Sequence, residues 1–447
     1  EIPEEEVTEK DTVLDTFIKD AVTEEVEKED GTKETVEKVP AKKMAKIVKR
    51  PVAINDIHPL WTKHPNECSD EDYKEFYRKV FHDYKEPLFW IHLNMDYPFN
   101  LKGILYFPKI NTEYESIEGT IKLYNNQVFV ADNIKEVIPE FLLLLKGVID
   151  CPDLPLNVSR SALQNDGFVK KISDYITKKV ADKLSGMCKT DKENYEKYWD
   201  DINPFIKFGC LKDEKFAEKM NDYIIFKNLD GKYLTLKECL EENKEKHENT
   251  VFYVTDEVEQ SQYINMFKNE GIDAVILTHN IDQPFITNME SKNENLKFKR
   301  IDADLSDSFK EETSKDELKD MTEKLSKTFK DALGKENLTV NVEKLKDASI
   351  SSMITLSEES RRMQDMMKMY GMAGMDPNMF GAEGQTLVLN ANNDLVKYVA
   401  EHTDGENTKI ICEQLYDLAM LSHAPLSPEQ MTGFIARSNK IMELLAK

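Results

Sequence analysis

The chain has 447 residues, of which 40% are hydrophobic and 32% are charged, and its formal net charge is −24. This length predicts a globular protein of about three domains. The negative charge repels phosphate backbones and anionic lipids, which excludes nucleic acid and membrane surfaces as general partners. No segment approaches the roughly 20 consecutive apolar residues that a transmembrane helix requires.

Cysteine and histidine spacing bears on the compartment and on metal binding. The six cysteines form no C-x-x-C pair, and the eight histidines form no H-E-x-x-H motif. These spacings predict free thiols in a reducing compartment, the cytoplasm, and no metal site. The chain starts at Glu1 without an initiator methionine, which fits a fragment of a longer protein.

The first 50 residues are predicted to form a flexible acidic linker. Residues 1–40 contain 15 acidic and 5 basic side chains and few apolar ones, a composition typical of segments that pack no core. An exposed helix is the alternative. From Ala41 the charge changes sign, and a basic run leads to Pro51, where we expect the first folded domain to begin.

Strands and helices alternate from about residue 54 to residue 205. Clustered β-branched and aromatic residues predict strands at 101–107 and 121–130. Ser69, followed by three acidic residues, is a helix start signal. A long amphipathic helix is predicted by apolar residues that recur every four positions, namely Phe168, Ile172, Ile176, Val180 and Leu184.

A βαβ pattern occupies residues 250–278. A strand at 251–254 is followed by a helical segment at 257–270 and a second strand at 274–277. Units of this kind often bind nucleotides, but the first turn here has no G-x-G-x-x-G motif. We therefore favour a structural α/β layer over an enzyme that uses this unit.

The C-terminal part begins with a charged, mostly helical segment and continues with strands at 338–342 and 350–356. Two amphipathic helices, 408–422 and 428–446, close the chain. Their apolar stripes predict a four-helix bundle between two subunits, and therefore a homodimer. The predicted interface residues are Ile411, Leu415, Leu418, Phe434, Ile435, Ile441, Met442 and Leu445.

A methionine-rich stretch lies between these strands and helices. One predicted helical face, called here the methionine stripe, combines Met363, Met366, Met367 and Tyr370. Such a stripe can be ordinary core. It can also be a surface that repacks around varied partners, since methionine is flexible and polarizable. The glycines that follow favour this second interpretation.

Arg160 is the candidate for phosphate chemistry. It ends the loop 151–160, in which two prolines favour an extended backbone and Asn157 or Ser159 can cap the following turn. A helix N-terminus attracts anions, and an arginine there suits bidentate contact with phosphate or carboxylate. From these residues alone, a structural salt bridge and a phosphate contact both remain open.

Seven segments, in this order, closely resemble the middle domain of the 90-kDa heat-shock protein family, and its bacterial branch, high-temperature protein G, fits best. These segments are Pro59–Lys63, Asp72–Tyr77, Leu105–Pro108, Ile121–Tyr124, Val128–Val130, Ile138–Leu142 and Asp153–Arg160. The resemblance covers about residues 54–447.

The resemblance implies site residues. Arg160 would hold the γ-phosphate of ATP, Gln164 would assist it, and Asn157 would lead the catalytic loop. The methionine stripe and Trp61 would contact client proteins, although core packing is equally open for Trp61. ATP and magnesium would bind to the family's N-terminal domain, whose motifs this sequence lacks. We therefore expect no cofactor in this chain and no ATPase activity from it alone.

The implied fold is α/β and α+β, with an αβα-layered middle domain followed by an α+β C-terminal dimerisation domain. The expected boundaries are a linker at 1–50, a large middle subdomain at 51–205, a small one at 206–300 and the C-terminal domain at 301–447. The implied function is ATP-dependent protein folding under stress, with partly folded clients and the chain's own ATPase domain as partners. An ATP-independent holdase or scaffold dimer is the alternative.

Overall fold

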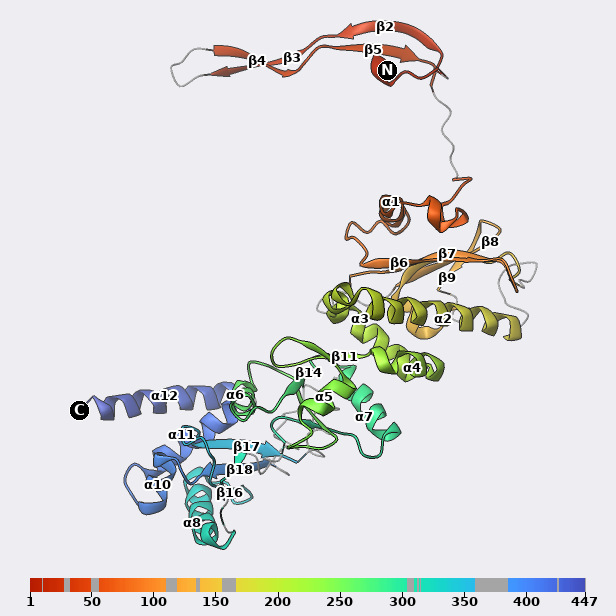
Figure 1. The fold of residues 1–447 in the computed structure, drawn as a ribbon. Coiled ribbons are helices and arrows are strands. Elements are labelled where there is room, and N and C mark those ends of the chain that lie inside the picture. The colour runs from red at the N-terminus through yellow and green to blue at the C-terminus, as the bar shows by residue number, and fades with distance from the viewer. Residues whose placement is uncertain are drawn as a thin grey trace. The chain divides into compact units, whose positions relative to one another are not determined.

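A computed structural model of the chain shows a mixed α/β fold, as predicted (Figure 1). Two compact units, Glu1–Lys63 and His64–Lys447, make up the chain. The structure describes residues 1–9, 11–27, 33–49, 56–109, 119–133, 137–154, 166–303, 309–311, 313, 315–357, 385–423 and 426–446.

The first unit corrects the prediction of a flexible linker, because most of its described residues form paired strands. Its elements are β1 (Ile2–Pro3), η1 (Glu4–Glu6), β2 (Val13–Lys19), β3 (Val22–Glu27), β4 (Lys33–Val39), β5 (Lys42–Ile47) and η2 (Leu60–Thr62). β5 lies between β1 and β2, and β3 pairs with β4. Both faces of a two-stranded ribbon such as β3–β4 contact water, so its strands can contain many glutamates. Opposite charges also pair across it, as between Lys38 Nζ and Glu24 Oε2 at 2.8 Å.

The second unit begins with a five-stranded sheet of order β6-β7-β10-β8-β9. Its strands are β6 (Phe89–Met95), β7 (Leu101–Phe107), β8 (Thr120–Asn125), β9 (Val128–Asp132) and β10 (Lys146–Asp150). β10 runs parallel to β8 and antiparallel to β7. The single strand predicted at 121–130 is instead the hairpin β8–β9, because Asn126 and Gln127 adopt positive φ values of 50° and 63° and turn the chain.

Helices cover both faces of this sheet, giving the three layers that were predicted (Figure 1). Tyr106 of β7 faces α1, with its ring 5.0 Å from that of Tyr77. The next residue, Phe107, faces α3, with its ring 5.2 Å from that of Phe205. The helical elements are η3 (Pro65–Glu67), α1 (Asp70–Phe81), η4 (Glu140–Leu144), α2 (Asp166–Thr190), α3 (Lys192–Lys212), α4 (Glu214–Met220) and η5 (Asn221–Tyr223).

Local signals account for these helices. Ser69 caps α1 in a reciprocal hydrogen-bonded pair with Asp72, as its sequence predicts. In the apolar repeat of α2, Phe168 is half-buried and the other four residues are buried, namely Ile172, Ile176, Val180 and Leu184. α3 continues through Pro204, which cannot donate to the carbonyl of Asp200. The side-chain amide of Asn203 donates to that carbonyl instead, at 3.3 Å, and α3 passes the predicted domain boundary at residue 205 without a break.

The βαβ prediction is confirmed in a small parallel sheet of order β14-β13-β15. Its strand β13 faces two cores: Val251 and Tyr253 pack with the large sheet's core, whereas Phe252 and Val254 pack against C-terminal residues. The elements here are β11 (Ile225–Lys227), β12 (Tyr233–Thr235), α5 (Leu236–Glu242), β13 (Thr250–Val254), α6 (Ser261–Asn269), β14 (Ala274–Ile276), α7 (Asp282–Lys292) and β15 (Lys297–Arg300).

The C-terminal part packs helices on a sheet of order β16-β18-β17, and its predicted strands and terminal helices are confirmed. Its elements are α8 (Lys315–Leu333), β16 (Thr339–Glu343), β17 (Ser352–Leu356), β18 (Gln385–Asn390), α10 (Asp394–Glu401), α11 (Thr408–Leu421) and α12 (Pro428–Leu445). Among the described helices, none is long and apolar enough to cross a membrane.

Candidate functional site

The three residues predicted for phosphate chemistry, Asn157, Arg160 and Gln164, lie outside the described residues. The structure nevertheless defines where their loop begins and ends. The loop follows β10, the central strand of the large sheet, and precedes α2. Both of its ends are held by hydrogen bonds or aromatic packing to one edge of that sheet.

The beginning of the loop is tied to the end of β8. The backbone N–H of Cys151 donates to the carbonyl of Tyr124 at 3.1 Å. The side-chain amide of Asn125 donates to the carbonyls of both Cys151 and Pro152, each at 3.1 Å. In return, the N–H of Gln127 donates to the Asp150 carboxylate at 2.9 Å. The turn between β8 and β9 therefore supports the last residue of β10 and the first two residues of the loop.

A second contact joins both ends of the loop to the turn before β7. Asp153 Oδ2 accepts hydrogen bonds from the backbone N–H of Asn100 at 2.7 Å and from its side-chain amide at 3.3 Å. Phe168, in the first turn of α2, packs against the neighbouring Phe99 with 5.6 Å between ring centroids. The loop therefore leaves the sheet and returns to it beside residues 99–100.

The described residues at this edge hold the backbone in place and are not reactive groups. Burial raises the pKa of the Cys151 thiol to about 12, so the thiol stays protonated at neutral pH and is not a nucleophile. Burial also raises the pKa of Tyr124. The polar groups of Asn125, Asp150 and Asp153 are engaged in the contacts with the backbone of neighbouring turns.

The small parallel sheet is closed at the edge where related sheets bind nucleotides. Ligands of such sheets bind beyond the carboxyl ends of the strands. Here Arg300, at the end of β15, pairs with the buried Asp302 and donates to Thr255 Oγ1, beyond β13, at 3.3 Å. His423, which follows α11, lies 3.5 Å from the Asp302 carboxylate. C-terminal side chains thus occupy this edge, which supports the structural interpretation of the βαβ unit.

The predicted dimer stripe divides into two groups in the structure. Leu415 is buried in the C-terminal core, and Ile411 and Phe434 pack against that core. Leu418 is exposed, Ile441 is half-buried, and three α12 side chains point to solvent, with exposed fractions of 52%, 58% and 82% for Ile435, Met442 and Leu445. α12 is held to α11 by Arg437, which pairs with Glu413 and Asp417.

Of the predicted client-binding residues, the structure describes Trp61 but not the methionine stripe. Trp61 is only 6% exposed, and this burial agrees with core packing. The methionine stripe, Met363, Met366, Met367 and Tyr370, lies outside the described residues. Its flanking strands are antiparallel neighbours in which Leu356 pairs with Gln385. The end of β17 and the start of β18, which flank this stretch in sequence, therefore lie at the same end of the sheet.

A family model described as Hsp90 protein matches residues 1–447 of the sequence. The chain belongs to the Hsp90 family. Chaperone protein HtpG of Bacteroides thetaiotaomicron is 42% identical over 366 residues, which cover 79% of this chain and 53% of that protein. HtpG of Porphyromonas gingivalis is 42% identical over 362 residues, covering 77% and 52%. HtpG of Sulfurimonas denitrificans is 27% identical over 407 residues, covering 88% and 63%.

These relatives place the chain in the bacterial HtpG branch of the Hsp90 family. The chain spans about half the length of the Bacteroides and Porphyromonas relatives. The family model covers the N-terminal strands as well as residues 54–447, to which the sequence resemblance applies.

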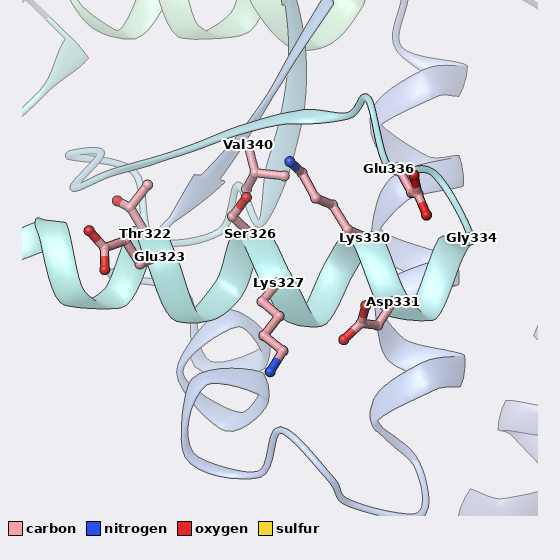
Figure 2. Close-up of a pocket in the computed structure, with 9 residues that line it drawn as sticks. All are labelled: Thr322, Glu323, Ser326, Lys327, Lys330, Asp331, Gly334, Glu336 and Val340. Atoms are coloured by element: carbon pink, nitrogen blue, oxygen red, sulfur yellow. The ribbon is translucent and has the colours of Figure 1, made fainter.

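One feature of this Hsp90-family chain was not predicted from the sequence, a polar groove of 660 Å³ along α8. In Figure 2, Ser326 and Lys330 extend from α8 toward Val340 of β16, whereas Lys327 points away. The sequence pattern that could have predicted this groove is a stripe of polar residues at helical spacing on α8. The groove is lined by Thr322, Glu323, Ser326, Lys327, Lys330, Asp331, Gly334, Glu336 and Val340.

Proposed function

We propose that this chain is the middle and C-terminal part of an ATP-dependent chaperone that acts in the cytoplasm as a homodimer on partly folded proteins. The observation that carries this proposal is the attachment of the Arg160 loop at both ends to the corner formed by Phe99 and Asn100. A loop that contributes to a site on another domain must be presented in a defined direction. Membership of the Hsp90 family supports the same conclusion.

In the proposed mechanism, Arg160 contacts the γ-phosphate of ATP bound to the nucleotide-binding domain of the family. Magnesium at that site would neutralise part of the phosphate charge. A guanidinium stabilises the charge that develops on the transferring phosphoryl group more than it stabilises bound ATP. Gln164 would assist Arg160, and Asn157 would shape the start of the loop. The chain contributes these groups in trans and is expected to be inactive by itself.

Dimerisation would be provided by the exposed apolar side of α12. Ile435 and Met442 are seven residues apart and therefore on one helical face, and both are exposed in the single chain. A second copy of α11 and α12 would cover them in a four-helix arrangement. Clients would be bound by the methionine stripe, whereas Trp61 would first have to become exposed.

The test joins this chain to the nucleotide-binding domain of an HtpG relative and measures steady-state ATP hydrolysis beside nucleotide titration. Arg160→Ala should lower turnover at least tenfold, since arginine fingers contribute roughly 10³–10⁵ elsewhere and other groups share the charge here. Nucleotide affinity should change much less. Arg78→Ala, which removes an exposed arginine paired with Glu71, is the matched control and should leave turnover unchanged.

The alternative, an ATP-independent holdase, predicts a different pattern. The chain would suppress aggregation of an unfolded protein equally well with and without ATP, and Arg160→Ala would have no effect on turnover. Wild-type turnover in the Arg160→Ala variant would leave Arg160 as a salt-bridge partner and refute the proposed catalytic role.

A further inference from the structure

We propose that the polar groove along α8 binds a short extended segment of a partner protein, with an acidic side chain at the centre of that segment. The groove has a volume of 660 Å³ and lies beside β16, the strand at one edge of the C-terminal sheet. The proposal goes beyond the proposed function, because it needs neither ATP hydrolysis nor dimerisation. Every residue that lines the groove lies in the described part of the chain.

The outer edge of β16 offers backbone hydrogen-bonding groups to the groove. On its inner side, the carbonyl of Glu343 accepts from the N–H of Ala391, which follows β18, at 2.9 Å. Backbone groups of successive strand residues point to alternate sides. Those of Val340, three residues before Glu343, therefore point away from β18, and no described residue forms a hydrogen bond with them.

The same edge already accepts an extended segment a few residues farther along. The N–H of Glu311 donates to the carbonyl of Lys344 at 2.9 Å, and the N–H of Lys346 donates to the carbonyl of Phe309 at 3.1 Å. These described pairs end at Lys344. An unpaired strand edge can take a strand from another chain, and its main-chain hydrogen bonds then supply much of the affinity.

Lys330 places a positive charge beside this edge. It extends from α8 toward Val340, and Ser326 lies next to it on the same side of the helix (Figure 2). Lys330 is half-buried, and its ammonium forms no ion pair with a described residue. Partial burial without a partner is unfavourable for a charge, and a carboxylate is the ligand group that forms the strongest hydrogen bonds with an ammonium. The side chains of Thr322 and Ser326 are small and leave room for the segment.

Charge and length define the segment further. Glu323 lies toward one end of the groove and Glu336 toward the other, whereas Lys327 and Asp331 point away from β16 (Figure 2). The complementary order is therefore basic, acidic, basic. From Glu323 to Gly334 the helix advances about 16 Å at 1.5 Å per residue, a distance that about five extended residues cover.

This size favours a short segment over a second copy of the chain. A strip about 16 Å long and one strand wide, with strands about 4.8 Å apart, is far smaller than the roughly 800 Å² per partner that a stable protein interface buries.

The test uses the whole chain without nucleotide and the fluorescein-labelled peptide Lys-Thr-Val-Asp-Val-Thr-Lys, with its C-terminus amidated. Fluorescence anisotropy should show saturable binding. Lys330→Glu should weaken binding at least fivefold by repelling the aspartate, and Ser326→Tyr should do so by filling the groove. Lys324→Glu is the matched control, because Lys324 is an exposed lysine of α8 outside the groove, and it should change the affinity less than twofold.

Altered peptides test the two kinds of contact separately. A peptide with lysine in place of aspartate should bind Lys330→Glu at least fivefold more tightly than it binds the wild-type chain. Two N-methylated forms of the first peptide, one methylated at both valines and one at both threonines, lack alternate backbone donors. At least one of them should bind at least fivefold more weakly, because pairing with Val340 requires a free N–H.

Several outcomes would overturn the proposal. Absence of binding to the wild-type chain is one, and full binding by both N-methylated peptides is another. Equal losses in Lys330→Glu and Lys324→Glu would assign the attraction to the general charge of α8. Self-association of the wild-type chain that Lys330→Glu abolishes in light scattering would make the groove an interface between copies. Should Ser326→Tyr fail to fold, Lys330→Glu and its charge-reversed peptide decide. No nucleotide is present, so none of these results depends on Arg160.

Discussion

A buried ion pair between α3 and α7 should be among the most sensitive contacts of the described chain. Lys207 Nζ pairs with Asp282 Oδ1, and the two side chains are only 4% and 3% exposed. Asp282 Oδ2 also accepts a hydrogen bond from the backbone N–H of His279 at 2.9 Å. The ring of Phe285 lies 5.8 Å from the ammonium. The pair therefore joins the helix of the large subdomain to the first turn of α7 with almost no water nearby.

Replacing Lys207 by Met keeps most of the side-chain volume but leaves the Asp282 carboxylate buried without its cation. Removing one partner of a buried pair costs about 3–5 kcal/mol, because the remaining charge is uncompensated. Such a loss should speed hydrogen exchange of the α7 amides by roughly two to four powers of ten, since exchange there reports local opening. Native-state hydrogen–deuterium exchange with mass spectrometry measures this directly.

Two further variants make this prediction decisive. Lys207→Met combined with Asp282→Asn removes both charges and keeps an acceptor for the His279 N–H, so it should recover most of the loss. Lys215→Met breaks an exposed pair with Asp174, whose side chains are 69% and 45% exposed, and should change stability by less than about 1 kcal/mol. If Lys207→Met alters α7 exchange by less than about threefold, the reasoning from burial is refuted.

Three other outcomes are expected. The double variant Ile435→Glu and Met442→Glu should be a monomer in light scattering, because a charge would replace each apolar contact of the proposed dimer. Its circular dichroism spectrum should not change, because both side chains are exposed in the single chain. A variant that remains dimeric would place the interface elsewhere. Gly209→Ala should destabilise the chain by about 1–3 kcal/mol, because the added Cβ would lie 2.7 Å from an aromatic ring atom. Gly186 has open space around it, so Gly186→Ala should instead stabilise α2 by about 0.5–1 kcal/mol. Equal melting temperatures for the two variants would contradict both expectations. Because its pKa is raised to about 12 by burial, the Cys151 thiol should resist alkylation at pH 8 in the native chain and react after denaturation, as peptide mass mapping can show.

The predicted site illustrates how far local sequence patterns reach. The motif Asp153–Arg160 identified the loop, and together with six other contiguous segments it identified the family. The residues that support the loop, Asn100 and Asn125, carried no signal of their own. Asparagine in a turn is common, and only the folded sheet brings these two side chains to the start of the loop.

The N-terminal residues contain a strand pattern, but their acidic composition led to the prediction of a linker. Residues 22–27 and 33–39 contain valines separated by polar residues, and Asp30-Gly31, a pair typical of hairpin turns, lies between them. The high acidic content favoured a linker because charge opposes burial in a core. A ribbon with solvent on both faces needs no such burial, so composition was the wrong criterion.

The sequence by itself determined α1, α2, the βαβ unit and the two terminal helices, because capping and apolar periodicity depend on residues that are close in sequence. The cap at Ser69 and the four-residue repeat of α2 are examples. The tertiary structure alone decided which face of each amphipathic helix is core: Leu415 is buried whereas Leu418, on the same predicted stripe, is exposed. It also decided the partner of Lys207, 75 residues away. Pairings of this kind depend on how layers pack, and a linear pattern carries no information about which distant surface will cover it.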